Sequence, residues 1–208
     1  VVVVGLGPAG RPWLTPEAQD ALASATDLVG YGPYLDRVPA NARQRRHPSG
    51  NRVEAERARH ALRLARDGAR VAVVSSGDPG VFAMAAAVLE AADEDEFAGV
   101  PVRVVPGLTA AQAVASRVGA PLGHDFCVLS LSDLLKPWDV IARRLTAAAE
   151  ADLVLALYNP SSSRRRHQLP AARELLLKHR PPETPVVIGR DVGGDAASAT
   201  VTPLGEPA

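Results

Sequence analysis

The sequence has little of several features that would assign it to a class at once. Cys127 is its only cysteine, so it can form no internal disulfide, which is typical of a reducing cytoplasm. No apolar run approaches the roughly 18 residues that a membrane-spanning helix needs. The opening VVVVG has neither the basic leader nor the cleavage site of a signal peptide. We therefore expect a cytoplasmic protein that does not enter a membrane.

The chain also has no excess of positive or negative charge. Lysine and arginine together number 23, as do aspartate and glutamate, and aromatic residues make up only 4%. A nucleic-acid-binding domain usually has a basic surface and aromatic rings on which bases stack, so we expect no nucleic-acid partner. The basic residues are almost all arginine, because Lys136 and Lys178 are the only lysines. Coding bias explains this simply, although the planar guanidinium also suits an anionic substrate.

Apolar, β-branched runs alternate with helical patterns along the chain. This alternation predicts an α/β fold with mostly parallel sheets. A stretch rich in glycine and proline, GAPLGHD, separates two such series, so we predict domains over residues 1–120 and 121–208. The predicted strands cover residues 1–4, 28–31, 71–75, 102–105, 126–131, 153–158, 186–189 and 199–204. The predicted helices cover residues 15–25, 53–67, 81–92, 108–118, 137–150 and 167–179.

Three glycine-containing loops follow strands of the first series: GLGPAG at residues 5–10, SSGDPG at 75–80 and VPGLTA at 105–110. In a parallel sheet the carboxyl ends of the strands share one edge, so we expect these loops to lie together and to bind a small polar ligand. The first loop matches G-x-G-x-x-G, but Pro8 and Pro12 delay the helix that would hold a pyrophosphate. The alternative is that the loops are only tight turns, with Asp78 as a helix cap.

The segments GLGPAG, SSGDPGVFAM and VVPGLTAAQAVASRVGAPLGHDF, in this order, resemble the tetrapyrrole methylase family over nearly the whole chain. More specific segments are VGYGPYLDRV, LSLSDLLKPWDVI and ALYNPSSSRRRHQL. The resemblance implies two αβα domains with S-adenosyl-L-methionine in the cleft between them. It also implies methylation of precorrin-3B at C-17, with ring contraction to precorrin-4, in cobalamin biosynthesis. The same family includes the methyltransferase acting on cobalt-factor III, which stays open as an alternative.

The resemblance assigns cofactor contacts residue by residue. These contacts fall on Pro8, Gly77, Asp78, Val81, Thr109, Ala110, Tyr158, Asn159 and Val192. The sequence departs from the family in the first loop, where relatives often have GPGD and this chain has an arginine, Arg11, in place of the acid. We therefore expect no catalytic role there. Relatives also continue beyond the TVTPLGE segment, so the second domain is expected to be incomplete.

Ring contraction needs a base, and tetrapyrrole carboxylates need cations. Candidate bases are His47, His124, Asp133 and Asp191, although a lone histidine is more often structural. Candidate substrate-binding residues are Arg45, Arg46, Arg52, Ser132 and Asp133. We predict that residues 43–52, which hold four arginines and no acid, form a mobile flap over the tetrapyrrole. The alternatives are a solvated basic loop, with the substrate acids met instead by residues 164–166.

The predicted partners are a tetrapyrrole and a second copy of the chain, as a homodimer, with no metal site of its own. Three other classes remain open. The first loop alone would suit a nicotinamide-dependent oxidoreductase. An RNA methyltransferase of the same superfamily is disfavoured by the neutral charge. A tetrapyrrole carrier without activity would bind pigment and ignore the cofactor.

Overall fold

The computed structural model describes residues 1–51, 53–134, 136–162 and 166–206. Contacts between residues divide the chain into two compact units. The first unit comprises Val1–Ala113 with Asp191–Ala197, and the second comprises Val114–Arg190 with Ser198–Ala208. The predicted domain boundary at residues 120–121 remains a prediction, and the contacts group a short segment beyond residue 190 with the first unit.

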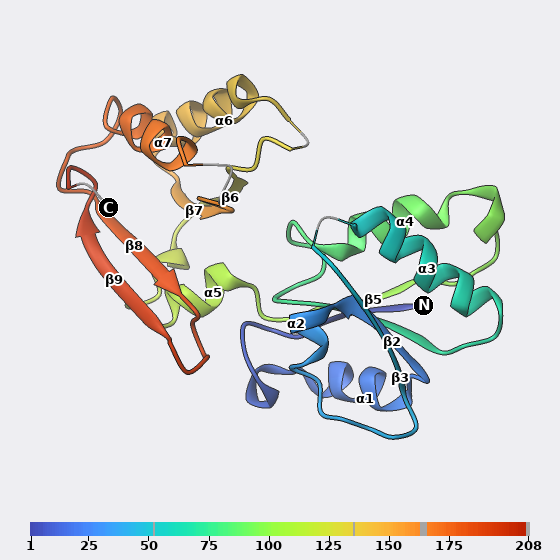
Figure 1. Ribbon diagram of the computed structural model, residues 1–208. Coiled ribbons are helices and arrows are strands. Elements are labelled where there is room, and N and C mark those ends of the chain that lie inside the picture. Colours follow the sequence, from blue (N-terminus) through green and yellow to red (C-terminus); the bar gives the residue numbers. More distant parts are fainter. Residues whose placement is uncertain (52, 135, 163–165, 207–208) are drawn as a thin grey trace. The chain divides into compact units, whose positions relative to one another are not determined.

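The first unit is built around a parallel sheet in the order β3-β2-β4-β1-β5 (Figure 1). Its strands are β1 (Val2–Gly5), β2 (Asp27–Tyr31), β3 (Arg45–Ser49), β4 (Val71–Ser75) and β5 (Arg103–Val105). Every pair of neighbours in this sheet runs parallel. The mostly parallel α/β architecture predicted from the sequence is thereby confirmed for this unit.

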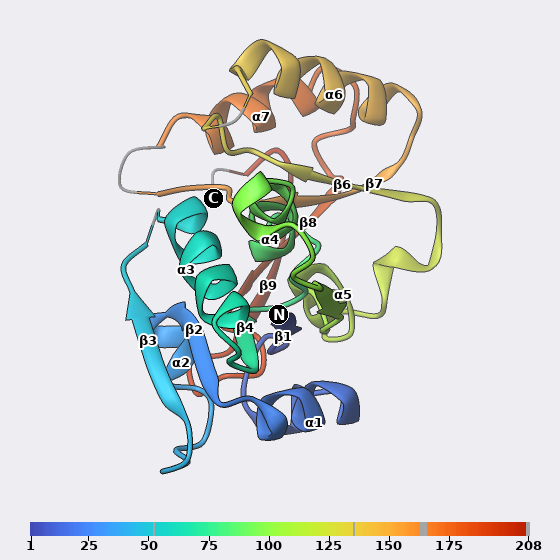
Figure 2. The ribbon, with the colours of Figure 1, turned by 90° about the vertical axis from the view of Figure 1, so that its right-hand side faces the viewer.

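Helices cover both faces of this sheet, as Figures 1 and 2 show. They are α1 (Pro16–Ser24), α2 (Gly32–Leu35), α3 (Glu54–Arg66) and α4 (Met84–Ala92), with 3-10 turns η1 (Arg11–Trp13) and η2 (Asp95–Phe97). Side chains alternate along a strand, so Val3 packs towards α3 and α4 while Val4 packs towards α1. Burial of both faces explains why these strands are apolar runs without alternation.

The bounds of the helices follow from local signals. The Thr15 hydroxyl accepts from the Ala18 N–H at 3.1 Å, and Pro16 opens α1, as predicted. Gly68, with φ +96°, lies directly past the end of α3. The predicted start of α4 at residue 81 is wrong, because Phe82 has a left-handed φ of +51° and the helix begins at Met84.

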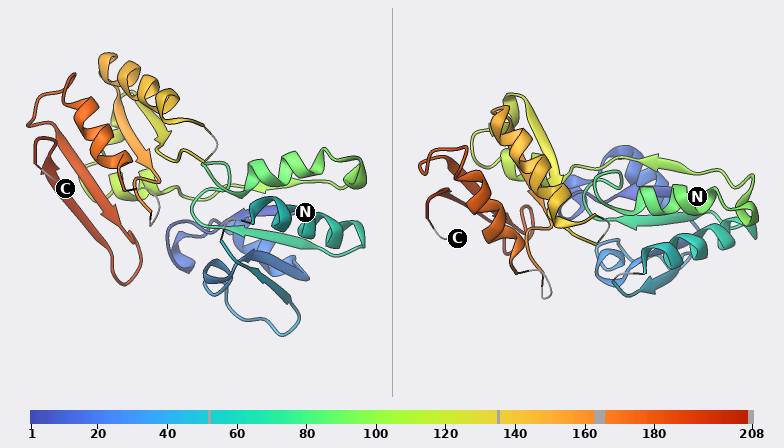
Figure 3. Two further views of the ribbon diagram at one scale, coloured as in Figure 1. Left: turned by 45° about the horizontal axis from the view of Figure 1, so that its top comes forward. Right: turned by 90° about the horizontal axis from the view of Figure 1, so that it is seen from above.

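In the second unit, the parallel pair β6 (Phe126–Ser130) and β7 (Val154–Tyr158) carries α6 (Trp138–Glu150) and α7 (Gln168–Leu176) on one face (Figure 3). Leu131, Ile141 and Leu145 form its buried core with Ala172. β8 (Pro185–Arg190) and β9 (Ser198–Pro203) form a separate antiparallel ribbon. The 3-10 turn η3 (Pro121–Gly123) also belongs to this unit, whereas α5 (Ala110–Ala115) begins in the first unit, which extends to Ala113.

One strand was not expected. The predicted flap over residues 43–52 is wrong in its centre, because β3 occupies Arg45–Ser49 and pairs with β2 along its length. A sequence of two arginines, a histidine and Pro48 reads as a loop, yet an edge strand tolerates charges and a proline. Within the described residues, no helix is both long enough and apolar enough to cross a membrane.

Candidate functional site

The three glycine-containing loops meet at the carboxyl edge of the first sheet. Their strands β4, β1 and β5 are neighbours. Gly7 and Gly77 form an antiparallel bridge, with the Gly7 N–H donating to the Gly77 carbonyl at 3.1 Å and the Gly77 N–H returning at 2.9 Å. Both residues have φ +64°, a left-handed conformation that glycine adopts without strain. The prediction that these loops share one edge is confirmed.

Contact between the loops is close enough to exclude side chains. A Cβ on Gly107 would lie 2.3 Å from the carbonyl oxygen of Gly77 and 3.0 Å from the backbone of Gly5. A Cβ on Gly5 would lie 2.6 Å from the nitrogen of Gly107. Because these neighbours are backbone atoms, they cannot move aside as a side-chain end could. The edge is therefore lined by backbone groups.

Asp78 joins the second loop to the third. One carboxylate oxygen accepts from the Gly80 N–H at 2.7 Å, and the other accepts from the Gly107 N–H at 3.0 Å. The first bond closes a local turn, which was the alternative to ligand binding in the sequence analysis. The second bond links two loops that are far apart in sequence. A carboxylate oxygen can accept more than one hydrogen bond, so contact with a ligand stays a prediction.

The remaining predicted cofactor contacts of the first unit lie on the same loops or beside them. Pro8, Val81 and Thr109 are half-buried, and the exposed Ala110 begins α5. Val192 is buried in the segment that groups with the first unit. The next residue, Gly193, lies so close to Trp13 that a Cβ there would be 2.7 Å from the indole nitrogen.

A polar cluster lies at the carboxyl ends of β6 and β7 in the second unit. The hydroxyl of the buried Ser130 accepts from the Asn159 side-chain amide at 3.0 Å and from the Ser132 N–H at 3.2 Å. Asn159 follows Tyr158, the last residue of β7, and has a left-handed φ of +52°. Predicted substrate and cofactor residues therefore share a hydrogen-bonded cluster here.

Asp133 belongs to the same edge and is fixed by a residue that the sequence analysis missed. Gln168, fully buried at the start of α7, donates from its amide nitrogen to one Asp133 oxygen at 2.9 Å. The amide oxygen of Gln168 is buried and has no hydrogen-bond partner. A single glutamine at the start of a helix carries no sequence signal, because its partner lies 35 positions away.

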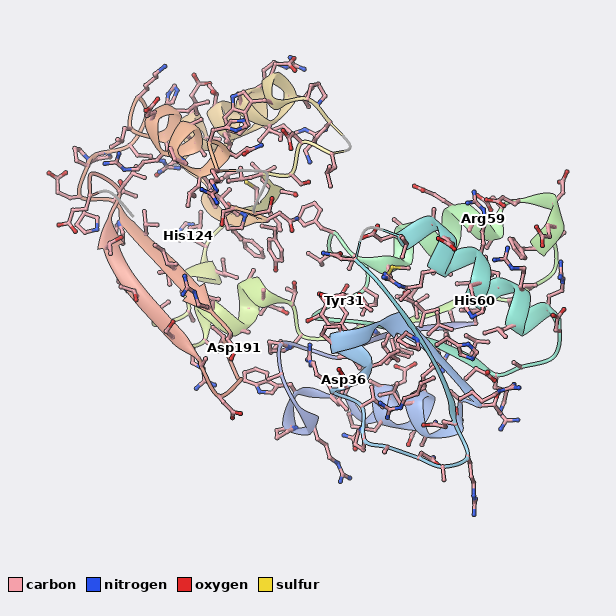
Figure 4. The ribbon with its side chains drawn as sticks, viewed as in Figure 1. Tyr31, Asp36, Arg59, His60, His124 and Asp191 are labelled. Carbon is pink, nitrogen blue, oxygen red and sulfur yellow. The ribbon has the colours of Figure 1, made fainter. Side chains whose placement is uncertain are left out.

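Two other candidate bases are placed differently. His124 is exposed and precedes β6, so it lies at the amino end of the strand whose carboxyl end leads to Asp133. Asp191 has φ +47°, and its carboxylate accepts from the Ala196 N–H at 3.0 Å within a tight turn. Figure 4 labels both residues. Position therefore favours Asp133 over His124, since sites in α/β sheets form at carboxyl ends.

The opposite, amino edge of the first sheet holds a charged cluster around the fully buried Asp27. Its carboxylate accepts from Thr26 Oγ1 at 2.7 Å, from both Nε and Nη2 of Arg45 at 2.9 and 3.0 Å, and from His47 Nε2 at 2.8 Å. His60 on α3, labelled in Figure 4, lies 3.2 Å from His47 Nδ1. Burial raises the pKa of Asp27, but these hydrogen bonds outweigh it and hold that pKa at about 2.

The arginines predicted to bind substrate are committed elsewhere or lie outside the described residues. Arg45 pairs with Asp27, and Arg46 donates to the carbonyls of Leu35, Val38 and Pro39 at 2.6–2.9 Å. Arg52, and residues 164–165 of the alternative basic run, are not among the described residues. No group of three or more acids, histidines or cysteines in the described part of the chain could hold a metal ion.

The sequence profile of the Tetrapyrrole (Corrin/Porphyrin) Methylases matches residues 1–208. The chain is 53% identical over 206 residues to the precorrin-3B C(17)-methyltransferase of Sinorhizobium sp, covering 98% of this chain and 81% of that protein. It is 66% identical over 194 residues to the cobalamin biosynthesis protein CobIJ of Mycobacterium tuberculosis, covering 93% of this chain. The chain spans only 38% of the length of that mycobacterial relative.

Two further relatives complete the comparison. The cobalt-factor III methyltransferase of Priestia megaterium is 39% identical over 208 residues, covering 98% of this chain and 38% of that protein. The crystal structure of the methyltransferase CobJ superposes with a TM-score of 0.96 at 46% identity, covering 100% of this chain and 87% of that one. The predicted fold class and the resemblance noted in the motifs are both confirmed.

Proposed function

Because the chain belongs to the tetrapyrrole methylase family, we propose that it is a methyltransferase of cobalamin biosynthesis that methylates precorrin-3B at C-17. The observation that carries this proposal is the 53% identity to a precorrin-3B C(17)-methyltransferase over 98% of the chain and 81% of that relative. The products are precorrin-4, formed with ring contraction, and S-adenosylhomocysteine.

The cofactor of this proposal is S-adenosyl-L-methionine, which supplies an activated methyl group when bound. The loops at the carboxyl edge of the first sheet fit such a group, because Gly5 and Gly107 let the loops pack backbone against backbone, and Gly77 has no side chain to keep a ligand from its backbone. Asp78 and Thr109 offer a carboxylate and a hydroxyl for the polar parts of the cofactor. The role of these residues is to bind and orient, since the reacting bond belongs to the cofactor.

We assign the proton transfer that ring contraction needs to Asp133. One of its oxygens accepts from Gln168, so the carboxylate is held in one orientation. The other oxygen accepts no hydrogen bond from the described residues and can take the proton of a substrate hydroxyl. Ser132, its neighbour, is assigned to substrate contact on the same edge.

Asp133→Asn tests this assignment. The amide keeps the shape but cannot act as a base, so turnover should fall by about 10²-fold or more. Affinity for S-adenosylhomocysteine, measured by calorimetry, should stay within about twofold. Equal losses of turnover and affinity would assign Asp133 to the cofactor or to the fold instead.

The activity itself is tested by mass analysis. The protein is incubated with methyl-labelled S-adenosylmethionine and candidate tetrapyrroles, and the product mass and the position of the label are determined. One labelled methyl at C-17 of precorrin-3B is the expected result. Label in RNA, or pigment bound without transfer, would contradict the proposal.

A second candidate substrate is cobalt-factor III, supported by the 39% identity to the Priestia megaterium methyltransferase over 98% of the chain. The same assay with metal-free and cobalt-containing substrates separates the two, and the higher identity of the Sinorhizobium relative favours precorrin-3B. We further propose a cytoplasmic homodimer. Sedimentation at two protein concentrations tests the dimer.

A further inference from the structure

Arg37, part of the segment VGYGPYLDRV but given no role in the sequence analysis, contacts two of the loops at the carboxyl edge of the first sheet. Its half-buried guanidinium comes from the chain just beyond α2. Nη2 donates to the backbone carbonyls of Leu6, Gly7 and Ala9, at 3.3, 2.8 and 2.6 Å. Nη1 donates to the Ser76 hydroxyl at 2.9 Å. One side chain therefore connects the first loop to the second.

Asp78 joins the second loop to the third, so the three loops are linked in series by two charged side chains and one backbone bridge. The Gly7 carbonyl accepts from both the Gly77 N–H and Arg37. Removing Arg37 leaves the backbone bridge in place but frees the carbonyls of Leu6 and Ala9. The carbonyls of the first loop then lose their hydrogen bonds from the Arg37 side chain.

The guanidinium also fixes which way the peptide groups of the first loop point. A carbonyl and the N–H of the next residue point to opposite sides of a planar peptide. With the Ala9 carbonyl turned to Arg37, the Gly10 N–H is turned away from it. Among the described residues, the direct hydrogen-bond partners of Arg37 are carbonyls and one hydroxyl, although the charge of Asp191 also acts on it.

We propose that Arg37 is a positioning residue for the cofactor: its guanidinium sets the peptide orientations of the first loop and the spacing between the first and second loops before S-adenosylmethionine binds. This inference rests on the proposed function, because it assumes that these loops hold the cofactor. A preorganised loop binds more tightly since less conformational freedom is lost on binding. The rigid, planar fork of arginine reaches several carbonyls at once, whereas the ammonium of lysine is a single point charge.

The test compares Arg37→Met and Arg37→Lys with the parent protein, using S-adenosylhomocysteine as the probe in calorimetry. Charge-assisted hydrogen bonds are the strong ones, so Arg37→Met should weaken affinity by about tenfold or more. Arg37→Lys should recover part of this loss. In turnover assays, KM for S-adenosylmethionine should rise while KM for the tetrapyrrole stays unchanged, a split that general loss of folding would not produce.

Arg57→Met is the matched control. Arg57 is another arginine of the first unit, more buried than Arg37, that donates to the Ser49 hydroxyl, the Gly50 carbonyl and the Met84 sulfur. None of these hydrogen-bond partners belongs to the three loops. Replacing Arg57 should lower stability and leave the affinity for S-adenosylhomocysteine within about twofold of the parent.

The measurements distinguish a failure of the proposed function from a failure of the role of Arg37. A parent protein that does not bind S-adenosylhomocysteine sinks the proposed function itself. A parent that binds, together with an Arg37→Met variant of equal affinity, overturns the role of Arg37 alone. If Arg37→Met does not fold, Arg37→Lys and Ser76→Ala replace it, and parent-like affinity in both overturns the proposal.

Discussion

The two edges of the five-stranded sheet are built in contrasting ways, the carboxyl edge by loops that follow β1, β4 and β5 and the amino edge by residues of β2 and β3. At the carboxyl edge, Gly5, Gly77 and Gly107 bring backbone against backbone, and a Cβ on Gly107 would lie 2.3 Å from a carbonyl oxygen. At the amino edge, the buried carboxylate of Asp27 collects hydrogen bonds from side chains, including those of Arg45 and His47. At the first edge, loop backbones pack directly on one another and Arg37 and Asp78 link them through side chains, whereas the second edge is filled by side chains that satisfy one another.

The two edges are therefore expected to contribute to different properties of the protein. Close backbone approach creates a binding surface but tolerates no added atom, so its residues are constrained by the ligand and by packing together. A buried charge cluster stabilises the fold only while every partner is present, since an unpaired buried charge is costly. We therefore expect substitutions at the carboxyl edge to change cofactor affinity, and substitutions at the amino edge to change stability alone.

The largest effect is expected for Gly107→Ala. The new methyl group meets backbone atoms of the first and second loops that cannot move aside, so the loops must separate. Overpacking of this kind costs about 1–3 kcal/mol, and affinity for S-adenosylhomocysteine should fall by at least about tenfold. Denaturant unfolding and calorimetry measure the two losses.

The control for this prediction is Gly32→Ala at the start of α2, where an added Cβ finds no heavy atom within 4 Å. It should match the parent in both assays. If Gly107→Ala also matches the parent, the loops do not meet as closely as described, and the contrast between the edges disappears.

A smaller effect, confined to stability, is expected for Asp27→Asn. The pKa of Asp27 is about 2 in the folded protein against an ordinary 3.8, so its stabilisation is present above about pH 4 and is lost as the pH falls towards 2. The shift corresponds to about 2 kcal/mol at pH 7. Urea unfolding at several pH values should show this loss in the parent and a flatter profile in the variant.

Asp67→Asn provides the matched control, because Asp67 forms an ion pair with Arg66 on the exposed surface. Its effect on stability should stay under about 1 kcal/mol. Calorimetry should give parent-like affinity for S-adenosylhomocysteine in both variants. A loss of affinity in Asp27→Asn would mean that the amino edge supports the ligand site after all.

The smallest effect is expected from His60. Burial lowers its pKa, as do the neighbouring charges of His47 and Arg63, whereas Asp27 and Glu56 raise it less. A histidine with a lowered pKa takes up its proton more readily in the unfolded chain, so stability is greatest above the ordinary pKa of 6.5 and falls as the pH drops below it. Urea unfolding between pH 7.5 and pH 5.5 should show that His60→Gln loses less stability than the parent as the pH falls. An identical pH dependence in the variant would show that His60 does not titrate with folding.

The sequence predicted much of the carboxyl edge because its signals are local. Glycine and proline directly after apolar runs mark turns at strand ends, and parallel strands bring such turns to one edge. The cap of α1 by Thr15 and the range of β4 were likewise readable from neighbouring residues. The family motifs added the identity of the ligand, which no composition or spacing carried.

The residues alone therefore predicted most of the elements in order, the three loops and the family. Three features became apparent only in the folded protein: Arg45–Ser49 is an edge strand, Arg37 connects two loops, and Gln168 holds Asp133. The physical reason is the same in each case. These side chains and this strand acquire their partners from residues distant in sequence, and a charged or amide side chain has no preferred partner until folding brings one within hydrogen-bonding distance.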